Sequence, residues 1–128
     1  MRARSSTPAG AVYLDRGLRI HELRAAAERA RRRLPALRRA VLFGSLADGT
    51  AGPRSDADLL VVLAKSPYRD PKDRVPEVLA ALAPLPCPLD LFVATERELA
   101  ELEAAGDPLL REVHRCGIEL IDPALLES

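Results

Sequence analysis

The 128-residue sequence has no tryptophan, and aromatic residues make up only 3% of it. Its aromatic side chains, Phe43, Phe92, Tyr13 and Tyr68, are too few for the stacking platform on which proteins bind single-stranded nucleic acid. The chain also lacks an excess of either charge, because 19 basic residues balance 19 acidic ones. We therefore expect neither nucleic acid nor an anionic membrane as a partner.

Cysteine and long apolar runs are scarce as well. Cys87 and Cys116 are too few for a disulfide framework and are not spaced as metal ligands, which fits a reducing compartment. No apolar run is long enough to span a bilayer, and no apolar secretion core follows the basic N-terminus. These absences predict a cytoplasmic protein in which residues 1–10 are disordered.

Hydrophobic periodicity predicts a single α/β domain over residues 11–128. Thr95 and Glu98 have the spacing of a capping box, and Asp107 followed by Pro108 has the pattern of a helix start. The expected elements are a helix over 15–34, a strand over 39–43, a loop over 44–54, a strand over 58–63, a helix over 71–82, a strand over 89–93, helices over 95–105 and 107–117, and a strand over 118–121. This order predicts an α/β (α+β) fold, in which helices pack on one small mixed sheet.

Three aspartates stand at the starts of two predicted strands. Asp56 and Asp58 are two residues apart, so their side chains point to the same side of an extended chain, roughly 7 Å apart. Asp90 starts the next strand, and if the two strands are neighbours, three carboxylates converge at one end of the sheet. Mg²⁺ prefers such ligands and would offset their mutual repulsion. Taken alone, the Asp56 and Asp58 pair would instead indicate ordinary turn chemistry.

A Gly-Ser turn follows the first predicted strand. Gly44 lets the backbone approach a phosphate closely, and Ser45 offers a hydroxyl and an N–H group. Acids that can hold a metal, facing a turn that can hold a phosphate, are the parts that phosphoryl or nucleotidyl transfer requires.

The stretch GSLADGTAGPRSDADLLVVL, with Asp90 downstream, resembles the nucleotidyltransferase signature of a Gly-Ser, a spacer of about ten residues and an Asp-x-Asp on a strand. Over residues 41–93 the chain is most similar to the minimal nucleotidyltransferase (MNT) domains of the DNA polymerase beta-like superfamily. The resemblance implies that fold. It also implies that Gly44 and Ser45 hold ATP, that Asp56 and Asp58 bind two Mg²⁺ ions, and that Asp90 helps hold one metal and takes the proton from an acceptor hydroxyl.

The resemblance further implies a partner. Many MNT domains are antitoxins that silence a HEPN-domain ribonuclease toxin by transferring AMP to one of its tyrosines, and such a pair is a hetero-oligomer. In one respect the sequence departs from that pattern, because Asp48 stands in the loop where MNT antitoxins commonly carry a basic residue. Arg54 and Lys65 are the candidate replacements for that cation.

Two other functions remain open from the sequence. The domain could be a binding module that neutralises a toxin by covering it, with Asp48 marking a weakened nucleotide pocket. It could also transfer AMP to a small molecule such as an aminoglycoside, with the acceptor pocket completed by dimerisation. The small size of the chain favours a protein acceptor, because relatives that act on small molecules carry a further domain to hold them.

Overall fold

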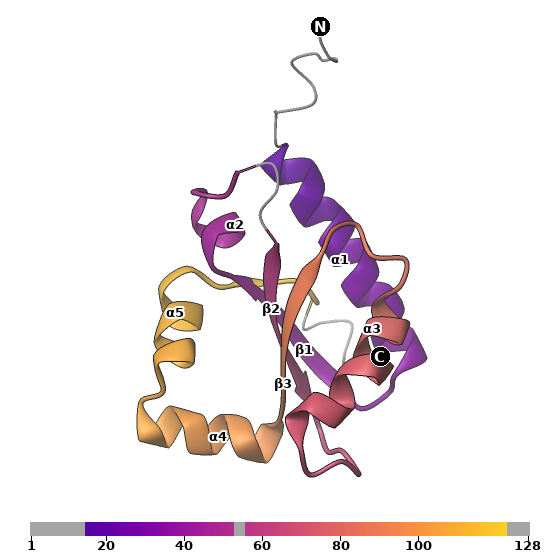
Figure 1. Ribbon diagram of the computed structural model, residues 1–128, viewed down its shortest axis with the longest axis vertical. Coiled ribbons are helices and arrows are strands. Elements are labelled where there is room, and N and C mark those ends of the chain that lie inside the picture. Colours follow the sequence, from indigo (N-terminus) through magenta and orange to yellow (C-terminus); the bar gives the residue numbers. More distant parts are fainter. Residues whose placement is uncertain (1–14, 53–55, 123–128) are drawn as a thin grey trace, which may run out of the picture.

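A four-stranded mixed sheet forms the centre of the molecule in the computed structural model, which describes residues 15–52 and 56–122 (Figure 1). The predicted disorder of residues 1–10 and the predicted role of Arg54 lie outside these ranges. The strands are β1 (Leu37–Phe43), β2 (Ala57–Leu63), β3 (Leu89–Thr95) and β4 (Ile118–Glu119). The helices are α1 (Arg16–Arg33), α2 (Ser45–Asp48), the 3₁₀ helix η2 (Pro71–Arg74), α3 (Val75–Leu82), α4 (Glu96–Ala105) and α5 (Pro108–Cys116).

The strand order is β3-β2-β1-β4, and the sheet mixes two kinds of pairing. β1 pairs antiparallel with both β2 and β4, whereas β2 pairs parallel with β3. A parallel pair needs a crossover connection, and η2 with α3 supplies it. The starts of β2 and β3 therefore lie at the same end of the sheet, where β1 ends and α2 begins (Figure 1).

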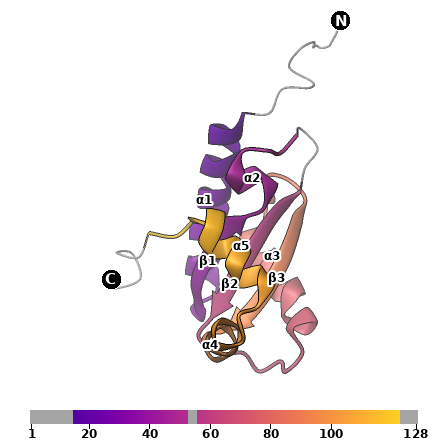
Figure 2. The same cartoon turned by 90° about the vertical axis from the view of Figure 1, so that its left-hand side faces the viewer.

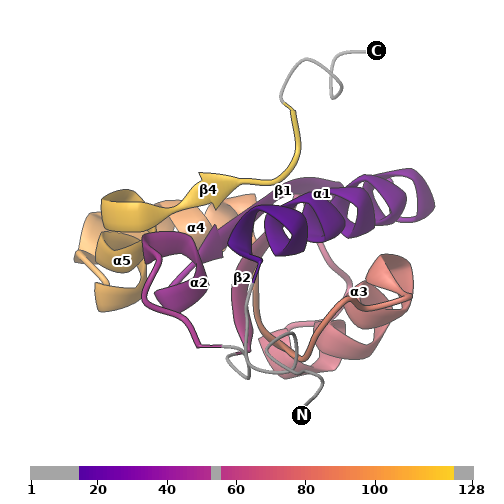
Figure 3. The ribbon, with the colours of Figure 1, turned by 90° about the horizontal axis from the view of Figure 1, so that it is seen from above.

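Helices cover both faces of the sheet. Seen from above, α1 and α3 lie on one side of the strands and α4 and α5 on the other (Figure 3), and α4 and α5 stand in front of the sheet when the molecule is turned (Figure 2). Alternate strand residues serve the two sides. On the α1 and α3 side the buried strand residues include Leu42, Leu59, Val61 and Leu63. On the α4 and α5 side they are Val41, Phe43, Leu60, Val62 and Ala94.

Side-chain caps set the starts of three helices. The Asp15 carboxylate accepts from the N–H of Leu18 at the start of α1, and the Asp107 carboxylate accepts from that of Leu109 at the start of α5. Thr95 and Glu98 form the predicted capping box, in which each side chain accepts from the other residue's backbone N–H. These polar caps satisfy N–H groups that a helix start otherwise leaves unpaired.

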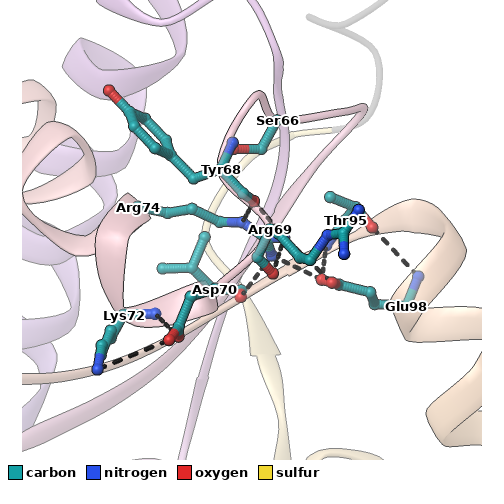
Figure 4. Close-up of polar contacts among 9 residues, drawn as sticks. Ser66, Tyr68, Arg69, Asp70, Lys72, Arg74, Thr95 and Glu98 are labelled. Carbon is teal, nitrogen blue, oxygen red and sulfur yellow. Dashed lines mark hydrogen bonds and ion pairs between the residues drawn. The ribbon is translucent and has the colours of Figure 1, made fainter.

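A buried arginine fixes the point where β3 passes into α4 (Figure 4). Arg74 is 2% exposed, and it donates to the backbone carbonyls of Tyr68 and Val93 and to the Glu98 carboxylate. The Arg74 guanidinium, with help from the capping box, lowers the pKa of Glu98 to about 2. Because burying an unpaired charge is costly, each partner of this pair depends on the other.

The structure confirms the predicted fold class and the order of the main elements. It adds α2, which lies inside the predicted loop over 44–54, and divides the predicted helix over 71–82 into η2 and α3. The last strand is shorter than predicted, since β4 covers only Ile118–Glu119. Within the described ranges, no helix has the length and apolar character needed to cross a membrane.

Candidate functional site

Strand register brings two of the predicted acids together. Asp58 on β2 lies directly opposite Asp90 on β3, and neighbouring strands are about 4.8 Å apart. Leu60 and Phe92, two residues further along, form the next pair on the same face, and Leu60 packs towards α5. The predicted convergence of Asp58 and Asp90 on one face is therefore confirmed.

Asp56 belongs to the same cluster of charge. It precedes β2 by one residue, and its charge acts on Asp58 together with those of Asp90 and Glu112. Partial burial of Asp58, reinforced by these three carboxylates, raises the pKa of Asp58 above its ordinary value. Among the described residues, no three acidic, histidine or cysteine side chains are already arranged around a single metal position. The acids are thus near one another without forming a closed set of ligands.

Gly44 ends β1 directly beside Asp58. Its backbone has a φ of 76° and a ψ of −157°, a combination that is essentially restricted to glycine. A Cβ atom at this position would overlap the Asp58 Oδ2 atom and lie 3.2 Å from the Asp58 Cγ atom. Only glycine therefore allows the turn to approach this carboxylate so closely.

Ser45 organises the loop that follows. It is the first residue of α2, and its carbonyl oxygen accepts from the N–H groups of Gly49, Thr50 and Ala51 at 2.9–3.0 Å. Gly49 has the left-handed conformation, with a φ of 88°, which lets the chain turn back on itself. The backbone of residues 44–51 is thereby folded into one compact turn against the end of β1 and the start of β2.

The acid that departs from the nucleotidyltransferase pattern is paired with a cation. Asp48 Oδ2 lies 3.2 Å from Arg115 Nη2 on α5, and Asp48 Oδ1 accepts from the backbone and hydroxyl of Thr50. The hydroxyl and N–H of Thr50, and then Arg115, lower the pKa of Asp48. Arg115 is also bound by Glu112, whose side chain accepts from both its Nε and its Nη2 at 2.8 Å.

A second arginine contacts the C-terminal end of α2. Arg16, at the start of α1, donates from Nε to the Leu46 carbonyl at 2.9 Å and from Nη2 to the Ala47 carbonyl. Carbonyls at the end of a helix lack partners within the helix, so a guanidinium there fixes the helix and complements its dipole. Arg16 and Arg115 thus contact α2 from two different helices.

The sequence did not indicate which basic residues adjoin the loop. Arg54 lies outside the described residues, and Lys65 follows the far end of β2, roughly 20 Å along the strand from Asp58. Lys65 is therefore wrong as a replacement cation. Arg16, Arg115 and Glu112 were missed because they come from helices before and after the motif, and nothing in the local sequence separates them from other charged helix residues.

A mainly apolar groove of about 650 Å³ lies beside these acids, along the outer edge of β3. Leu60 and Phe92 line it one residue pair beyond Asp58 and Asp90, and α4 forms another wall through Leu102 and Ala105. Phe92 is 43% exposed and contributes an aromatic surface to this groove.

Comparison with known families agrees with this geometry. The family described as "Nucleotidyltransferase domain" matches residues 23–115, which is more than half of the chain and includes Gly44, Ser45 and all three aspartates. The chain belongs to the nucleotidyltransferase domain family. This assignment confirms the resemblance seen in the sequence and gives the domain its general chemistry, transfer of a nucleotidyl group.

One solved structure supports the fold of this nucleotidyltransferase domain, and two others are similar to the chain with lower TM-scores. A candidate nucleotidyltransferase from Sulfolobus solfataricus is 23% identical, with a TM-score of 0.55 over 67% of this chain and 75% of that one. A toxin–antitoxin structure with AMP-PNP is 25% identical, with a TM-score of 0.45 over 84% and 73% of the two chains. A mutant of the toxin–antitoxin MntA-HpeT is 23% identical, with a TM-score of 0.45 over 88% and 81%. No curated protein matches the chain.

Proposed function

We propose that this domain transfers AMP from ATP to a hydroxyl group, in a site formed by Asp56, Asp58, Asp90 and the Gly44-Ser45 turn. The observation that carries the proposal is the register that sets Asp58 opposite Asp90, on the face that Gly44 approaches. In the reaction, the acceptor oxygen forms a bond to the α-phosphorus while the bond from that phosphorus to the β-phosphate oxygen breaks. Pyrophosphate leaves, and the hydroxyl proton passes to the Asp90 carboxylate and then to solvent.

The donor set fits divalent metal ions. The acids at the site are all carboxylates, which are hard oxygen ligands of the kind that Mg²⁺ prefers, and like charges that repel one another are stabilised by a cation. Partial burial first, and then this repulsion, raise the pKa of Asp58. Asp56 and Asp58 would hold two Mg²⁺ ions, with Asp90 sharing one. Bound Mg²⁺ would neutralise phosphate charge and orient the reacting groups.

The chain's own residues have distinct roles in this proposal. Gly44 allows the turn to pack directly against the Asp58 carboxylate, so phosphates bound at the turn would lie next to a metal held by Asp58. Ser45 offers its hydroxyl to the phosphates from a loop that its own carbonyl holds in shape. Asp90 lies on an edge strand with an exposed side chain, so an acceptor can reach it from outside the domain.

We further propose that the acceptor is carried by a protein, namely a tyrosine of a HEPN-type toxin, and that the domain acts as its antitoxin. The resemblance to MNT domains suggests this partner. The apolar groove along β3 supports a protein acceptor, because Leu91 and Phe92, which follow Asp90 on β3, line it and its volume of about 650 Å³ can hold apolar side chains of a docked segment. The described residues alone do not enclose an acceptor, which favours a partner that brings both the hydroxyl and the surface around it.

A labelling experiment tests both parts of the proposal. The purified protein is incubated with Mg²⁺, ATP radiolabelled at the α-phosphate and a lysate of its host, beside a reaction with Asp56→Asn. Asparagine keeps the shape of the side chain and removes the charge that would bind metal. We expect a labelled protein band that disappears with the variant, and mass spectrometry of the band then identifies the modified residue.

Other outcomes would change the proposal in defined ways. Label found only on small molecules would indicate an antibiotic-type transferase. A tight complex recovered without any labelling, and unchanged by Asp56→Asn, would indicate a binding module that covers its toxin. Label on serine or threonine would retain the transferase and reject the tyrosine acceptor.

A further inference from the structure

We propose that Arg115 on α5 binds the triphosphate of the nucleotide, and that Asp48 and Glu112 hold its guanidinium in place for this purpose. The inference rests on the proposed function and assigns to it a residue far from the Gly-Ser signature. It also gives Asp48 a role, because the acid in the loop then positions a cation instead of repelling the phosphates.

The hydrogen bonds of Arg115 leave one edge of its guanidinium available. Nε donates to Glu112 Oε1, and Nη2 donates to Glu112 Oε2 and to Asp48 Oδ2. A guanidinium has five N–H donors in a rigid plane, so these three bonds leave the two donors of Nη1. No described residue accepts a hydrogen bond from Nη1, and the side chain is 56% exposed. The two N–H groups of Nη1 point in different directions, so each can donate to a separate phosphate oxygen, and the positive charge of the guanidinium strengthens such bonds.

The position of α5 places this cation beside the phosphate turn. Leu110 and Val113 pack α5 against Val41 and Phe43, the strand residues that lead into Gly44. Asp48 is three residues after Ser45 on α2, so the two side chains are neighbours on one face of that helix, about 5–6 Å apart at Cβ. Arg115 contacts Asp48 and therefore stands within one helical turn of Ser45.

The negative charge of the site favours a cation in addition to the proposed Mg²⁺ ions. Asp58, Asp90, Asp56 and Glu112 all contribute negative charge around Asp58, and ATP adds more. Of the two arginines that contact α2, Arg16 is directed to the carbonyls at its end, and Arg115 reaches the carboxylate on its side. Arg115 is thus the described cation best placed to replace the basic residue that Asp48 displaces.

The test compares nucleotide affinities of matched variants by isothermal titration calorimetry with Mg²⁺. Arg115→Gln removes the cation, and Arg111→Gln removes the same charge from an exposed position one turn earlier, where the side chain has no ion-pair partner among the described residues. Exposed ion pairs add little to stability, so both variants should unfold at temperatures close to that of the wild type. We expect Arg115→Gln to weaken ATP binding about tenfold or more and AMP binding less than threefold. Arg111→Gln should leave both affinities within about twofold.

A double variant tests the part assigned to Asp48. In the Arg115→Gln background an unpaired carboxylate faces the triphosphate, so adding Asp48→Asn should recover part of the lost ATP affinity. Asparagine keeps an amide oxygen that can still accept from Thr50, so the turn should stay intact. A further loss of affinity in the double variant would overturn the positioning role of Asp48.

The outcomes separate this inference from the proposed function. Wild-type protein that binds ATP and transfers AMP, with Arg115→Gln equal to it in ATP affinity, overturns the role of Arg115 and leaves the transferase standing. Equal losses of ATP and AMP affinity would mean that Arg115 does not act on the triphosphate tail, and would overturn the inference as well. Wild-type protein that binds no ATP overturns both.

Discussion

Replacing Gly44 by alanine should disable the site through a single added methyl group. The backbone at Gly44 has a φ of 76° and a ψ of −157°, and residues other than glycine adopt such a conformation at a cost of about 1–3 kcal/mol. The lower conformational entropy of alanine in the unfolded chain offsets about 0.4–1 kcal/mol of this. The free energy of unfolding should therefore fall by about 1–2 kcal/mol, which leaves the protein folded.

The larger effect of Gly44→Ala should be on catalysis. The new methyl carbon would overlap Asp58 Oδ2 and lie 3.2 Å from Asp58 Cγ and 3.4 Å from its Cβ, so the carboxylate must rotate away. The strand itself cannot shift easily, because Asp58 is paired on both sides with Phe43 and Asp90. A displacement of about 1 Å in a reacting group can reduce a rate about 100-fold, and we expect a loss of that order in AMP transfer.

Gly49→Ala provides the matched control. Gly49 also has a positive φ, 88°, but a Cβ atom there would have no neighbour within 4 Å. Its substitution should cost about 1–2 kcal/mol of stability and leave the transfer rate within a few fold of the wild type. Stability is measured by urea unfolding and activity by release of pyrophosphate. Equal loss of activity in both variants, or full activity in Gly44→Ala, would refute the reasoning from Asp58.

Three further predictions concern separate parts of the molecule. Asp58→Asn should abolish transfer and raise the unfolding temperature measured in EDTA. Burial and the neighbouring carboxylates raise the pKa of Asp58 and disfavour its charged form, so removing the charge should stabilise the metal-free fold. A lower unfolding temperature would contradict this reasoning. Glu98→Gln should lower the unfolding free energy by about 2 kcal/mol at pH 7, a figure that allows for the 33% exposure of Glu98. The loss should shrink as the pH falls from 4.5 towards 2, because Arg74 stabilises only the ionised form of Glu98. Glu101→Gln, one turn away, is the control, and a loss that did not depend on pH would count against the ion pair of Arg74 and Glu98. Ala105→Arg places a bulky charged side chain at an exposed position that lines the groove, and it should reduce labelling of the protein acceptor at least tenfold while leaving ATP affinity unchanged. Undiminished labelling would exclude the groove as the docking surface.

Much of the fold could be predicted from the sequence, because its signals are local. The apolar spacing of α1, the capping box at Thr95 and the pair Asp107-Pro108 each depend on residues within a few positions of one another. The helix α2 could not be predicted in this way, since four residues show no helical periodicity. The 3₁₀ turn η2 runs directly into α3 without a break in the chain, and its four residues are too few to show a period of their own, so its different geometry was also missed.

The candidate site was only half predictable for a related reason. The Gly-Ser turn and the aspartates lie on the strands or in the loops before them, so the sequence pattern could identify them. That Asp58 and Asp90 lie on neighbouring strands in matching register is known only from the structure. Arg115 comes from a helix packed on the sheet about 60 residues later, and only the tertiary structure shows that it meets Asp48. Charges that approach from other elements leave no periodic trace in the sequence.

The parallel pairing of β2 and β3 also determines where the chain can change length. Asp90 faces Asp58 because of its position within β3, so a single residue inserted between Leu89 and Asp90 would turn the carboxylate to the opposite face. The connection between α3 and β3 is held at its ends, since Arg29 and Arg33 donate to the carbonyls of Ala83 and Pro84 and the Pro88 carbonyl accepts from the Ala57 N–H. Between these ends, at residues 85–86, lengthening a surface loop costs little and does not alter the strand that follows. We therefore expect natural length variation to collect in this connection, which also makes it the place to graft a reporter peptide without disturbing the acids.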